Sequence, residues 1–374
     1  MEIEARLSPI DDALLLESEW RSLEISEHVS FFLSWDWIGS LLNALPKDST
    51  PLLMRVQSGG RTLALGLFSI GKERRRRVIN SRVLRLNETG VSEYDSITVE
   101  HNGLLTRDGF QRAAIEAAMR RLVRQDAWDE LYLSGLRSDG QPDWIAAAQS
   151  LNLNYLERWE KPYHFVDLDQ LRSTGSTYLD SLGSNTRYQI RRAMKLYQAR
   201  GPLTLRQATS LTEALGWLLE LSELHQVYWQ ARGLPGAFAS DFARRFHNSV
   251  VRNGWPRNTV QIVKIVAGES VVGYAYNFRK GRVLYNYQTG MKSEEDFKLK
   301  PGLVCHALIA ADACDKGLGT YDLLAGGSHY KRSLTNAEGR MTWAVVQKRR
   351  LVFGIENSLR VAHACYRRGL KSIR

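Results

Sequence analysis

The order of the predicted helices and strands constrains the fold of this chain more than any single motif does. In the first half, apolar periodicity predicts two helices, at about 14–23 and 33–44. Alternating runs and further periodic segments then predict strands at 52–56, 63–70, 83–86 and 95–99, a helix at 109–124, a strand at 130–134, a helix at 144–150, and strands at 154–158 and 163–166.

The second half repeats this order, although no repeat is visible residue by residue. Its predicted elements are a helix at 185–199, a strand at 203–206, helices at 211–231 and 240–252, strands at 260–266, 271–279 and 282–289, a helix at 301–316, strands at 321–325 and 342–347, and a helix at 355–368. We therefore predict an α/β (α+β) protein of two similar halves that arose by duplication. Each half is expected to be a mixed, mostly antiparallel sheet flanked by helices.

The expected halves are residues 1–160 and 161–374, with the join near 160–171. A chain of 374 residues suits two domains of moderate size, and 44% hydrophobic residues suffice for a core. Because no Pro-, Gly- or Ser-rich linker separates the halves, we expect them to pack closely.

Charge divides unevenly between the halves. Residues 1–160 carry a formal net charge of −5, whereas residues 161–374 carry +16. A basic half favours an anionic partner, such as nucleic acid, an acidic glycan or a phosphorylated cofactor. A solvated basic surface without function is the alternative.

The sequence favours a cytoplasmic protein without a membrane span. The N-terminus lacks the basic and apolar regions of a signal peptide. The most apolar stretch, residues 303–314, is about half the length of a membrane span and reads as a buried helix. The three cysteines form no CxxC pair, which fits a reducing compartment, and no zinc-ligand spacing occurs, so no metal is expected.

The predicted helix at 301–316 begins in a way that suits phosphate. Pro301 at the first turn costs no hydrogen bond, and Gly302 lets a ligand approach the backbone. The free N–H groups and the positive end of the helix dipole favour an anion there. Lys300, Pro301, Gly302 and Leu303 are therefore candidate cofactor-binding residues, although an ordinary helix start would have the same sequence.

A second basic feature lies on the predicted helix at 185–199. Arg187 and Arg191 are one turn apart on one face, next to an apolar stripe. Arginine suits a bidentate grip on phosphate or carboxylate, so both are candidate substrate-binding residues. A solvated face is the alternative.

The helix at 211–231 carries His225 on its apolar face, with Trp229 one turn later. His225 is a candidate base, while a hydrogen-bonded core histidine is the structural alternative. Trp229, Tyr276 and Tyr285 are candidate residues for lining an acceptor pocket, because flat aromatic faces suit carbohydrate.

The strand at 321–325 ends in Gly326-Gly327, followed by Tyr330 and Lys331. Polar side chains at the C-terminal edge of a strand commonly meet ligands in open α/β sheets. Asp322 is a candidate proton acceptor, and Lys331 is a candidate for stabilising an oxyanion or binding phosphate, unless it is merely exposed. Tyr330 is a candidate substrate contact.

Several of these segments together resemble the CelD/BcsL-type GNAT acetyltransferases. The matching motifs occur in the same order and are Arg187-x-x-x-Arg191-Arg192, Leu224-His225 with Trp229, Arg232-Gly233 and Gly236-Ala237-Phe238, then Pro301-Gly302, and Asp322-x-Leu324-x-Gly326 with Tyr330-Lys331. The sequence departs from the family at Lys300, where serine is usual, and at Tyr228, where arginine is common. It also lacks the usual GNAT phosphate-loop signature.

The resemblance implies two GNAT-like halves, similar in fold to the FemAB peptidyltransferases, and a role in exopolysaccharide biosynthesis. It implies acetyl transfer from acetyl-CoA, or another acyl-CoA, to an amine or hydroxyl of a small molecule or glycan precursor. It also implies a transition-state role for Lys331, because a lysine in the corresponding Fem segment has one. Two alternatives stay open: Fem-like aminoacyl transfer from tRNA, and a degenerate, non-catalytic scaffold or glycan-binding subunit.

Overall fold

The computed structural model describes residues 2–26, 28–49, 51–75 and 79–356. Most of the helix predicted at 355–368 lies outside these residues. In the first half the elements are β1 (Glu4–Ser8), α1 (Ala13–Leu23), α2 (Trp35–Ala44), β2 (Leu52–Ser58), β3 (Arg61–Arg75), β4 (Ile79–Leu86), β5 (Leu105–Thr106), α3 (Gln111–Val123), β6 (Glu130–Arg137), α4 (Gln141–Ser150) and β7 (Asn154–Asp167).

The second half repeats the same succession after two extra helices. Its elements are α5 (Leu168–Thr174), α6 (Ser184–Gln198), β8 (Leu203–Gln207), α7 (Leu211–Gln230), α8 (Asp241–Gly254), β9 (Val260–Ala267), β10 (Ser270–Lys280), β11 (Val283–Met291), α9 (Pro301–Asp315), β12 (Thr320–Ala325), α10 (His329–Ser333) and β13 (Ala337–Gln347). Strand β8 thus corresponds to β1, α9 to α3, and β13 to β7.

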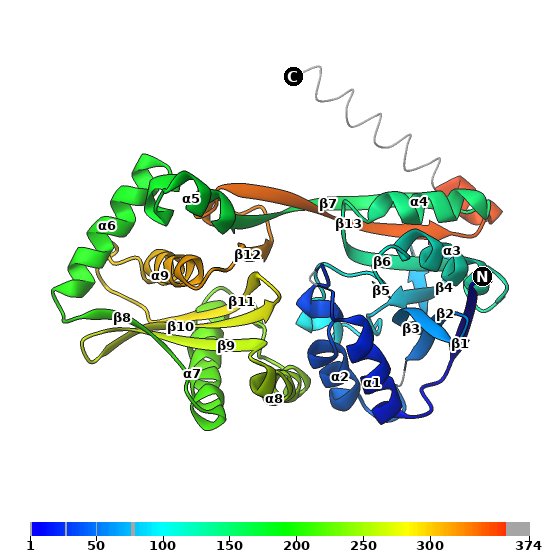
Figure 1. Cartoon of the computed structure of the whole chain (residues 1–374), viewed down its shortest axis with the longest axis horizontal. Coiled ribbons are helices and arrows are strands. Elements are labelled where there is room, and N and C mark those ends of the chain that lie inside the picture. The colour runs from blue at the N-terminus through cyan, green and yellow to red at the C-terminus, as the bar shows by residue number, and fades with distance from the viewer. Residues whose placement is uncertain (1, 27, 50, 76–78, 357–374) are drawn as a thin grey trace, which may run out of the picture.

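The strands of both halves join into one sheet of 13 strands in the described part of the chain. The order is β1-β2-β3-β4-β6-β13-β7-β12-β11-β10-β9-β8, with β5 paired to β3. Each half therefore gives its last strand to the other: β7 pairs with β12, and β13 pairs with β6. Figure 1 shows these two long strands bridging the two lobes. The predicted α/β class, with a mostly antiparallel sheet flanked by helices, is confirmed.

Two predicted strands differ from the structure. Residues 95–99 do not form a strand, since Asp95–Ile97 is a short 3-10 helix. The Asp95 carboxylate accepts hydrogen bonds from the backbone N–H groups of Thr89 and Gly90, both at 2.7 Å, and this local turn replaces strand pairing. The strands predicted at 154–158 and 163–166 are one strand, β7, so a boundary after residue 160 lies inside it.

Helices cover both faces of the sheet in the second half. Helices α7 and α8 pack against β9, and α7 also packs against β10 and β11, while α9 contacts β10 and β11 from the core that it shares with α5 and α6. Because β11 lies next to β12 and α9 connects them, the start of α9 lies near the point where these two strands end (Figure 1).

The two halves share an aromatic core. Phe31 of the first half stacks on Phe278 of β10 with ring centroids 4.1 Å apart, and Trp37 of α2 contacts Phe246 of α8 at 4.8 Å. These side chains belong to one buried cluster that contains residues from both halves. The expectation of close packing between the halves agrees with this shared core.

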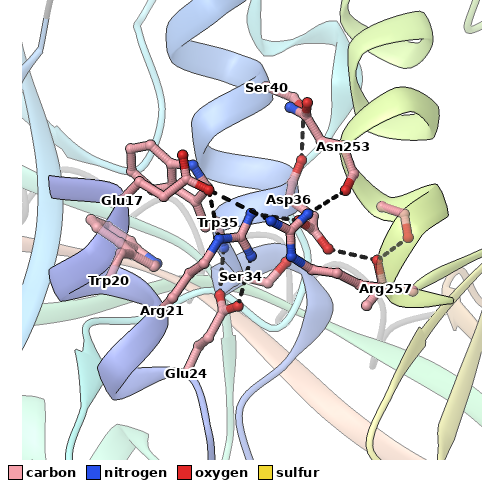
Figure 2. Close-up of polar contacts among 12 residues, drawn as sticks. Glu17, Trp20, Arg21, Glu24, Ser34, Trp35, Asp36, Ser40, Asn253 and Arg257 are labelled. Atoms are coloured by element: carbon pink, nitrogen blue, oxygen red, sulfur yellow. Dashed lines mark hydrogen bonds and ion pairs between the residues drawn. The ribbon is translucent and has the colours of Figure 1, made fainter. Parts of the chain in front are cut away.

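A buried carboxylate, Asp36, joins the halves beside that core (Figure 2). Its Oδ1 lies 3.0 Å from Arg21 Nη2 in the same half and 3.6 Å from Arg257 Nη1 in the other. Its Oδ2 accepts a hydrogen bond from Thr259 Oγ1 at 2.6 Å. Nearby, Asn253 Nδ2 donates to Ser40 Oγ at 2.9 Å. Since Asp36 is 1% exposed, these partners compensate for burying its charge.

Within the described residues, no helix is both long and apolar enough to span a bilayer.

Candidate functional site between the two halves

The candidate site begins where β11 and β12 separate. These parallel strands pair at only three positions, from Val283–Thr320 to Tyr285–Asp322. Beyond Asp322 the pairing of β12 with β7 is also irregular until Ala325. Leu324 has a φ of +64°, a left-handed conformation that is uncommon for leucine. Regular pairing is therefore interrupted here, and side chains bind backbone groups of Leu324 and Ala325.

Asp322 stabilises this irregular strand end. Its Oδ1 accepts a hydrogen bond from the backbone N–H of Leu324 at 2.7 Å. Its Oδ2 lies 3.0 Å from Nε2 of His101, which belongs to the other half. Both side chains are more than nine-tenths buried. The contact is within ion-pair distance but is not aligned as a hydrogen bond.

Glu100 reaches the same strand end from the first half. Its Oε2 accepts a hydrogen bond from the backbone N–H of Ala325 at 2.6 Å. Burial raises the pKa of this carboxyl group, and the nearby Asp322 carboxylate raises it further. The Ala325 hydrogen bond and the positive charge of Lys331 act in the opposite direction.

Lys331 lies on α10, directly after the strand. Its Nζ donates hydrogen bonds to the backbone carbonyl oxygens of Ala325, at 2.7 Å, and Leu324, at 3.4 Å. Burial lowers the pKa of the ammonium group, while the carboxylates of Glu100 and Asp322 raise it. The structure thus brings the predicted Asp322 and Lys331 together. We call Glu100, His101, Asp322 and Lys331 the inter-half cluster.

Aromatic rings surround the His101 side chain of this cluster. Tyr163 of β7 meets it edge-on with ring centroids 4.8 Å apart, and Tyr285 of β11 lies at 5.6 Å. Phe32 packs on both His101 and Tyr285. The predicted substrate-lining residue Tyr285 therefore borders the cluster, although it is only 5% exposed.

The start of α9 has the features of an anion site, and the Tyr330 hydroxyl lies beside it. Lys300 is the N-cap residue, Pro301 occupies the first turn, and no side chain caps the helix. Lys300, Pro301 and Gly302 are partly exposed, whereas Leu303 is buried. A Cβ atom on Gly302 would lie 2.4 Å from the Tyr330 hydroxyl. The Tyr330 side chain, which was predicted to contact substrate, therefore occupies part of the space beside Gly302.

The two predicted arginines lie on helix α6 (Figure 1), whose first residues line a pocket together with His329 and Arg332 of α10. Their nearest acidic partner is Asp180, whose Oδ1 lies 3.6 Å from Arg187 Nη1 and 3.7 Å from Arg191 Nη2. Arg187 also donates to the backbone carbonyl of Leu182 at 3.4 Å. These contacts are loose, and they neutralise part of the basic face.

His225, Trp229 and Tyr276 lie in the aromatic region around α7 and α8. The His225 ring packs on Trp229 and Phe238, and burial lowers its pKa. Tyr276 is fully buried against His247. These contacts make His225 a core histidine in this structure and leave Tyr276 without an exposed face.

Glu100 and His101 are not among the candidate residues predicted from the sequence. They follow a segment predicted as a strand. The sequence feature that could have marked them is the Glu-His-Asn run at positions 100–102, directly before a glycine. His101 has a φ of +49°, and left-handed backbone at a non-glycine residue often marks a constrained site. Their importance comes from contact with the other half, which no local pattern encodes.

Comparison with known proteins finds a matching domain family and similar folds. Residues 184–332, which contain Asp322, Lys331 and the start of α9, match the family of acetyltransferase (GNAT) domains. None of the curated protein sequences compared with the chain matches it.

Three solved structures share the architecture of the whole chain. FemX superposes with a TM-score of 0.58 at 9% identity, covering 91% of this chain and 97% of FemX. The structure of L-PGS from Bacillus licheniformis has a TM-score of 0.53 at 10% identity, covering 94% and 98%. The C-terminal domain of a putative lysylphosphatidylglycerol synthetase from Agrobacterium fabrum has a TM-score of 0.51 at 11% identity, covering 95% and 96%. The chain therefore shares the fold of these structures over nearly its whole length, and residues 184–332 of its second half match the acetyltransferase (GNAT) domain model.

Proposed function

We propose that this protein transfers an acyl group, expected to be acetyl, from acyl-CoA to an amine or hydroxyl acceptor at the inter-half cluster. The observation that carries the proposal is the position of Lys331. Its ammonium group is held at the end of β12, where β11 and β12 diverge, beside two buried carboxylates. A fixed positive charge at such an opening suits the stabilisation of a developing oxyanion.

The donor would lie along the diverging strands with its diphosphate at the start of α9. Pro301, Gly302 and Leu303 open this helix without a side-chain cap, and Lys300 adds a positive charge. Backbone N–H groups at a helix start and the helix dipole both favour phosphate. The Tyr330 hydroxyl, next to Gly302, would donate to the diphosphate or move aside.

The chemistry would be direct transfer within a ternary complex. The acceptor atom attacks the thioester carbonyl carbon, its bond to that carbon forms, and the carbon–sulfur bond breaks. Lys331 stabilises the negative oxygen of the tetrahedral intermediate, and Asp322 takes part in proton removal. The cluster holds these groups before substrate arrives, which lowers the barrier through positioning.

The two halves would have different roles in binding the two substrates. Residues 161–374 would bind the donor, and residues 1–160 would supply Glu100, His101 and contacts to the acceptor. Following the CelD/BcsL resemblance, we propose a sugar or polysaccharide precursor as the acceptor and the cytoplasm as the place of action.

Calorimetric titration with acetyl-CoA tests the proposal. The full chain should bind acetyl-CoA, Gly302→Ala should weaken binding, and Lys331→Met should slow transfer while binding stays within a few-fold. The exposed Lys316→Met variant serves as the matched control, since Lys316 pairs with Asp312 on the surface of α9. If the unmodified protein does not bind acetyl-CoA, the acyl-CoA proposal is wrong, and a scaffold or aminoacyl role must replace it.

Aminoacyl transfer from tRNA is the second candidate, and the charge distribution favours it. Residues 161–374 carry a net charge of +16, and the fold is shared with FemX and lysylphosphatidylglycerol synthetases. A phosphate backbone bound by many cations gives an affinity that falls steeply with salt. Filter binding of aminoacyl-tRNA between 50 and 200 mM salt, about the range in which such contacts weaken, distinguishes this candidate from acyl-CoA.

A further inference from the structure

The first half contains a cavity of about 350 Å³, close to the lower limit for ligand pockets. It lies between the start of α3, at Gln111, and the end of β6, at Leu136 and Arg137. In the repeated element order, α3 and β6 correspond to α9 and β12. The cavity is therefore the counterpart, in the first half, of the proposed donor opening in the second half.

The chain itself fills the rest of that counterpart opening. Asn102 forms a bridge with Leu136 of β6 and donates from Nδ2 to the carbonyl of Leu86 at the end of β4, at 2.9 Å. Asn87 Nδ2 in turn donates to Asn102 Oδ1 at 2.8 Å. Because these residues occupy the space between β4 and β6, only a smaller compartment remains.

His101 forms part of the cavity wall and also belongs to the inter-half cluster. It is 4% exposed, and its Nδ1 has no hydrogen-bond partner among the described residues. Its Nε2 lies 3.0 Å from Asp322 Oδ2. A buried ring nitrogen without a partner costs free energy unless a ligand or water satisfies it. The cavity is the compartment from which such a partner can come.

Arg137 is a second link between the cavity and the cluster. It lines the cavity and pairs with Asp139 through Nη2 at 2.6 Å. It also lies close enough to the hydroxyl groups of Tyr163 and Tyr285 to interact with them electrostatically. Both tyrosines pack on the His101 ring. His101 and Arg137 therefore both line the cavity and lie next to groups of the inter-half cluster.

We propose that this cavity binds the acceptor and that His101, oriented by Asp322, is the general base of the reaction. This inference rests on the proposed acyl transfer. In the tautomer that carries its proton on Nε2, the nitrogen 3.0 Å from Asp322 Oδ2, the neutral ring leaves Nδ1 as a proton acceptor. The acceptor oxygen attacks the acyl carbon as its proton passes to Nδ1. When the carbon–sulfur bond breaks, the same proton passes to the thiolate of CoA, so His101 returns to its neutral form.

The lining favours a small, neutral acceptor rich in hydroxyl groups. Ser30, Thr106 and Gln111 offer donors and acceptors, and Leu104 and Trp144 supply apolar surface. Arg137 pairs with Asp139, while the Asp108 carboxylate accepts a hydrogen bond from the neutral Ser26 hydroxyl at 2.8 Å and keeps its negative charge. An anionic molecule would therefore find no uncompensated positive charge here. A hydroxyl nucleophile also needs a base as it attacks.

Chemical rescue tests the role of His101. Its φ of +49° is a backbone conformation that glycine adopts without strain, so His101→Gly removes the ring and keeps the backbone. We expect this variant to slow acetyl-CoA hydrolysis, with water as the acceptor, by about 100- to 10,000-fold, the usual contribution of a general base. Added imidazole should restore at least about a tenth of the lost rate, whereas Asp322→Asn should be slow with or without imidazole. A change below about threefold, or a loss that imidazole does not restore, overturns the proposal.

A cavity-filling variant tests the acceptor site. Gly103 lines the cavity, and a Cβ atom there meets nothing within 4 Å, so Gly103→Leu should fill space without a clash. Gly216→Leu, on the exposed face of α7 and equally free of neighbours, is the matched control. N-acetylglucosamine is the probe, and the NMR signal of the His101 ring is the readout.

The probe should shift the His101 signal in the unmodified chain and in Gly216→Leu, but not in Gly103→Leu. If no shift occurs, or if filling the cavity leaves it unchanged, the acceptor site is wrong. Acetyl-CoA calorimetry on the same samples separates this result from failure of the proposed function. Gly103→Leu and His101→Gly should still bind acetyl-CoA within about threefold of the unmodified protein, because the cavity lies outside the donor opening.

Discussion

Glu100 Oε2 accepts a hydrogen bond from the backbone N–H of Ala325 at 2.6 Å, so a carboxylate of the first half binds the end of a strand in the second half. Lys331 Nζ binds the carbonyl oxygen of the same Ala325 residue at 2.7 Å. Both backbone groups of one residue are thus held by ionisable side chains, and the irregular end of β12 is fixed in place. This arrangement makes each half necessary for the geometry of the site.

Lys331→Met should reduce kcat by about 100- to 1,000-fold, because loss of one preorganised oxyanion donor has effects of this size. The KM for acyl-CoA should change little, since the proposed diphosphate site is at α9. Steady-state kinetics with free-thiol detection measures both constants. An equal loss in Lys316→Met, the surface control, would show that the effect is not specific to the cluster.

The Tyr330 hydroxyl and Gly302 should be energetically coupled. A Cβ atom at residue 302 would lie 2.4 Å from that hydroxyl, so Gly302→Ala must displace the Tyr330 side chain. We expect Gly302→Ala to weaken acetyl-CoA binding about tenfold in the unmodified background and less in the Tyr330→Phe background. Calorimetry on the four proteins of this double-mutant cycle gives the coupling free energy. Identical effects in both backgrounds would contradict a shared space at the helix start.

Asp36→Ala should destabilise the whole protein, because Arg21, Arg257 and Thr259 lose a buried acceptor. Glu17 still pairs with both arginines, so the cost should lie below the value of about 3–5 kcal/mol for breaking a fully buried ion pair. Urea unfolding followed by tryptophan fluorescence should show this loss in a single transition, since the halves share one core. The exposed pair of Asp241 and Arg244 gives the control: Asp241→Ala should cost less than about 1 kcal/mol.

His247→Phe should make the protein less sensitive to acid. His247 is fully buried with both ring nitrogens unpartnered, and burial lowers its pKa from 6.5 to about 3. A histidine with a lowered native pKa contributes stability that is present above pH 6.5, where the unfolded chain is also neutral. That contribution is lost as the pH falls from 6.5 toward 3, by up to about 1.4 kcal/mol for each pH unit.

Thermal unfolding between pH 7 and pH 4 checks this expectation. The Tm of His247→Phe should fall less than that of the unmodified protein over this range, and at pH 7 the two should be similar. The exposed residue His28 serves as the control, and His28→Phe should follow the unmodified curve. Parallel curves for all three proteins would mean that His247 is not buried in a neutral form.

Local information was sufficient for most of the elements. The apolar period predicts α7 and α8 close to their observed bounds, because each of these helices buries one face of its own sequence. Helix α9 follows from its apolar stretch, which is buried almost continuously from Leu303 to Ala310. Pro301 and Gly302 mark the start of α9 for the same local reason. The repeated order of elements, which follows from these local signals, was enough to predict two similar halves.

The sequence by itself thus determined most of the helices and strands, their repeated order, and the position of Asp322 and Lys331 around the end of one strand, because those features depend on neighbours along the chain. Only the tertiary structure decided that β7 and β13 exchange between the halves and that Glu100 and His101 reach the end of β12. Residues 95–99 show the reason. Their alternating pattern predicts a strand, but the Asp95 carboxylate accepts hydrogen bonds from the nearby backbone N–H groups of Thr89 and Gly90 and forms a turn instead. His101, which follows this turn, contacts Asp322 of the other half. Such a contact depends on how the two halves pack and not on spacing in the sequence.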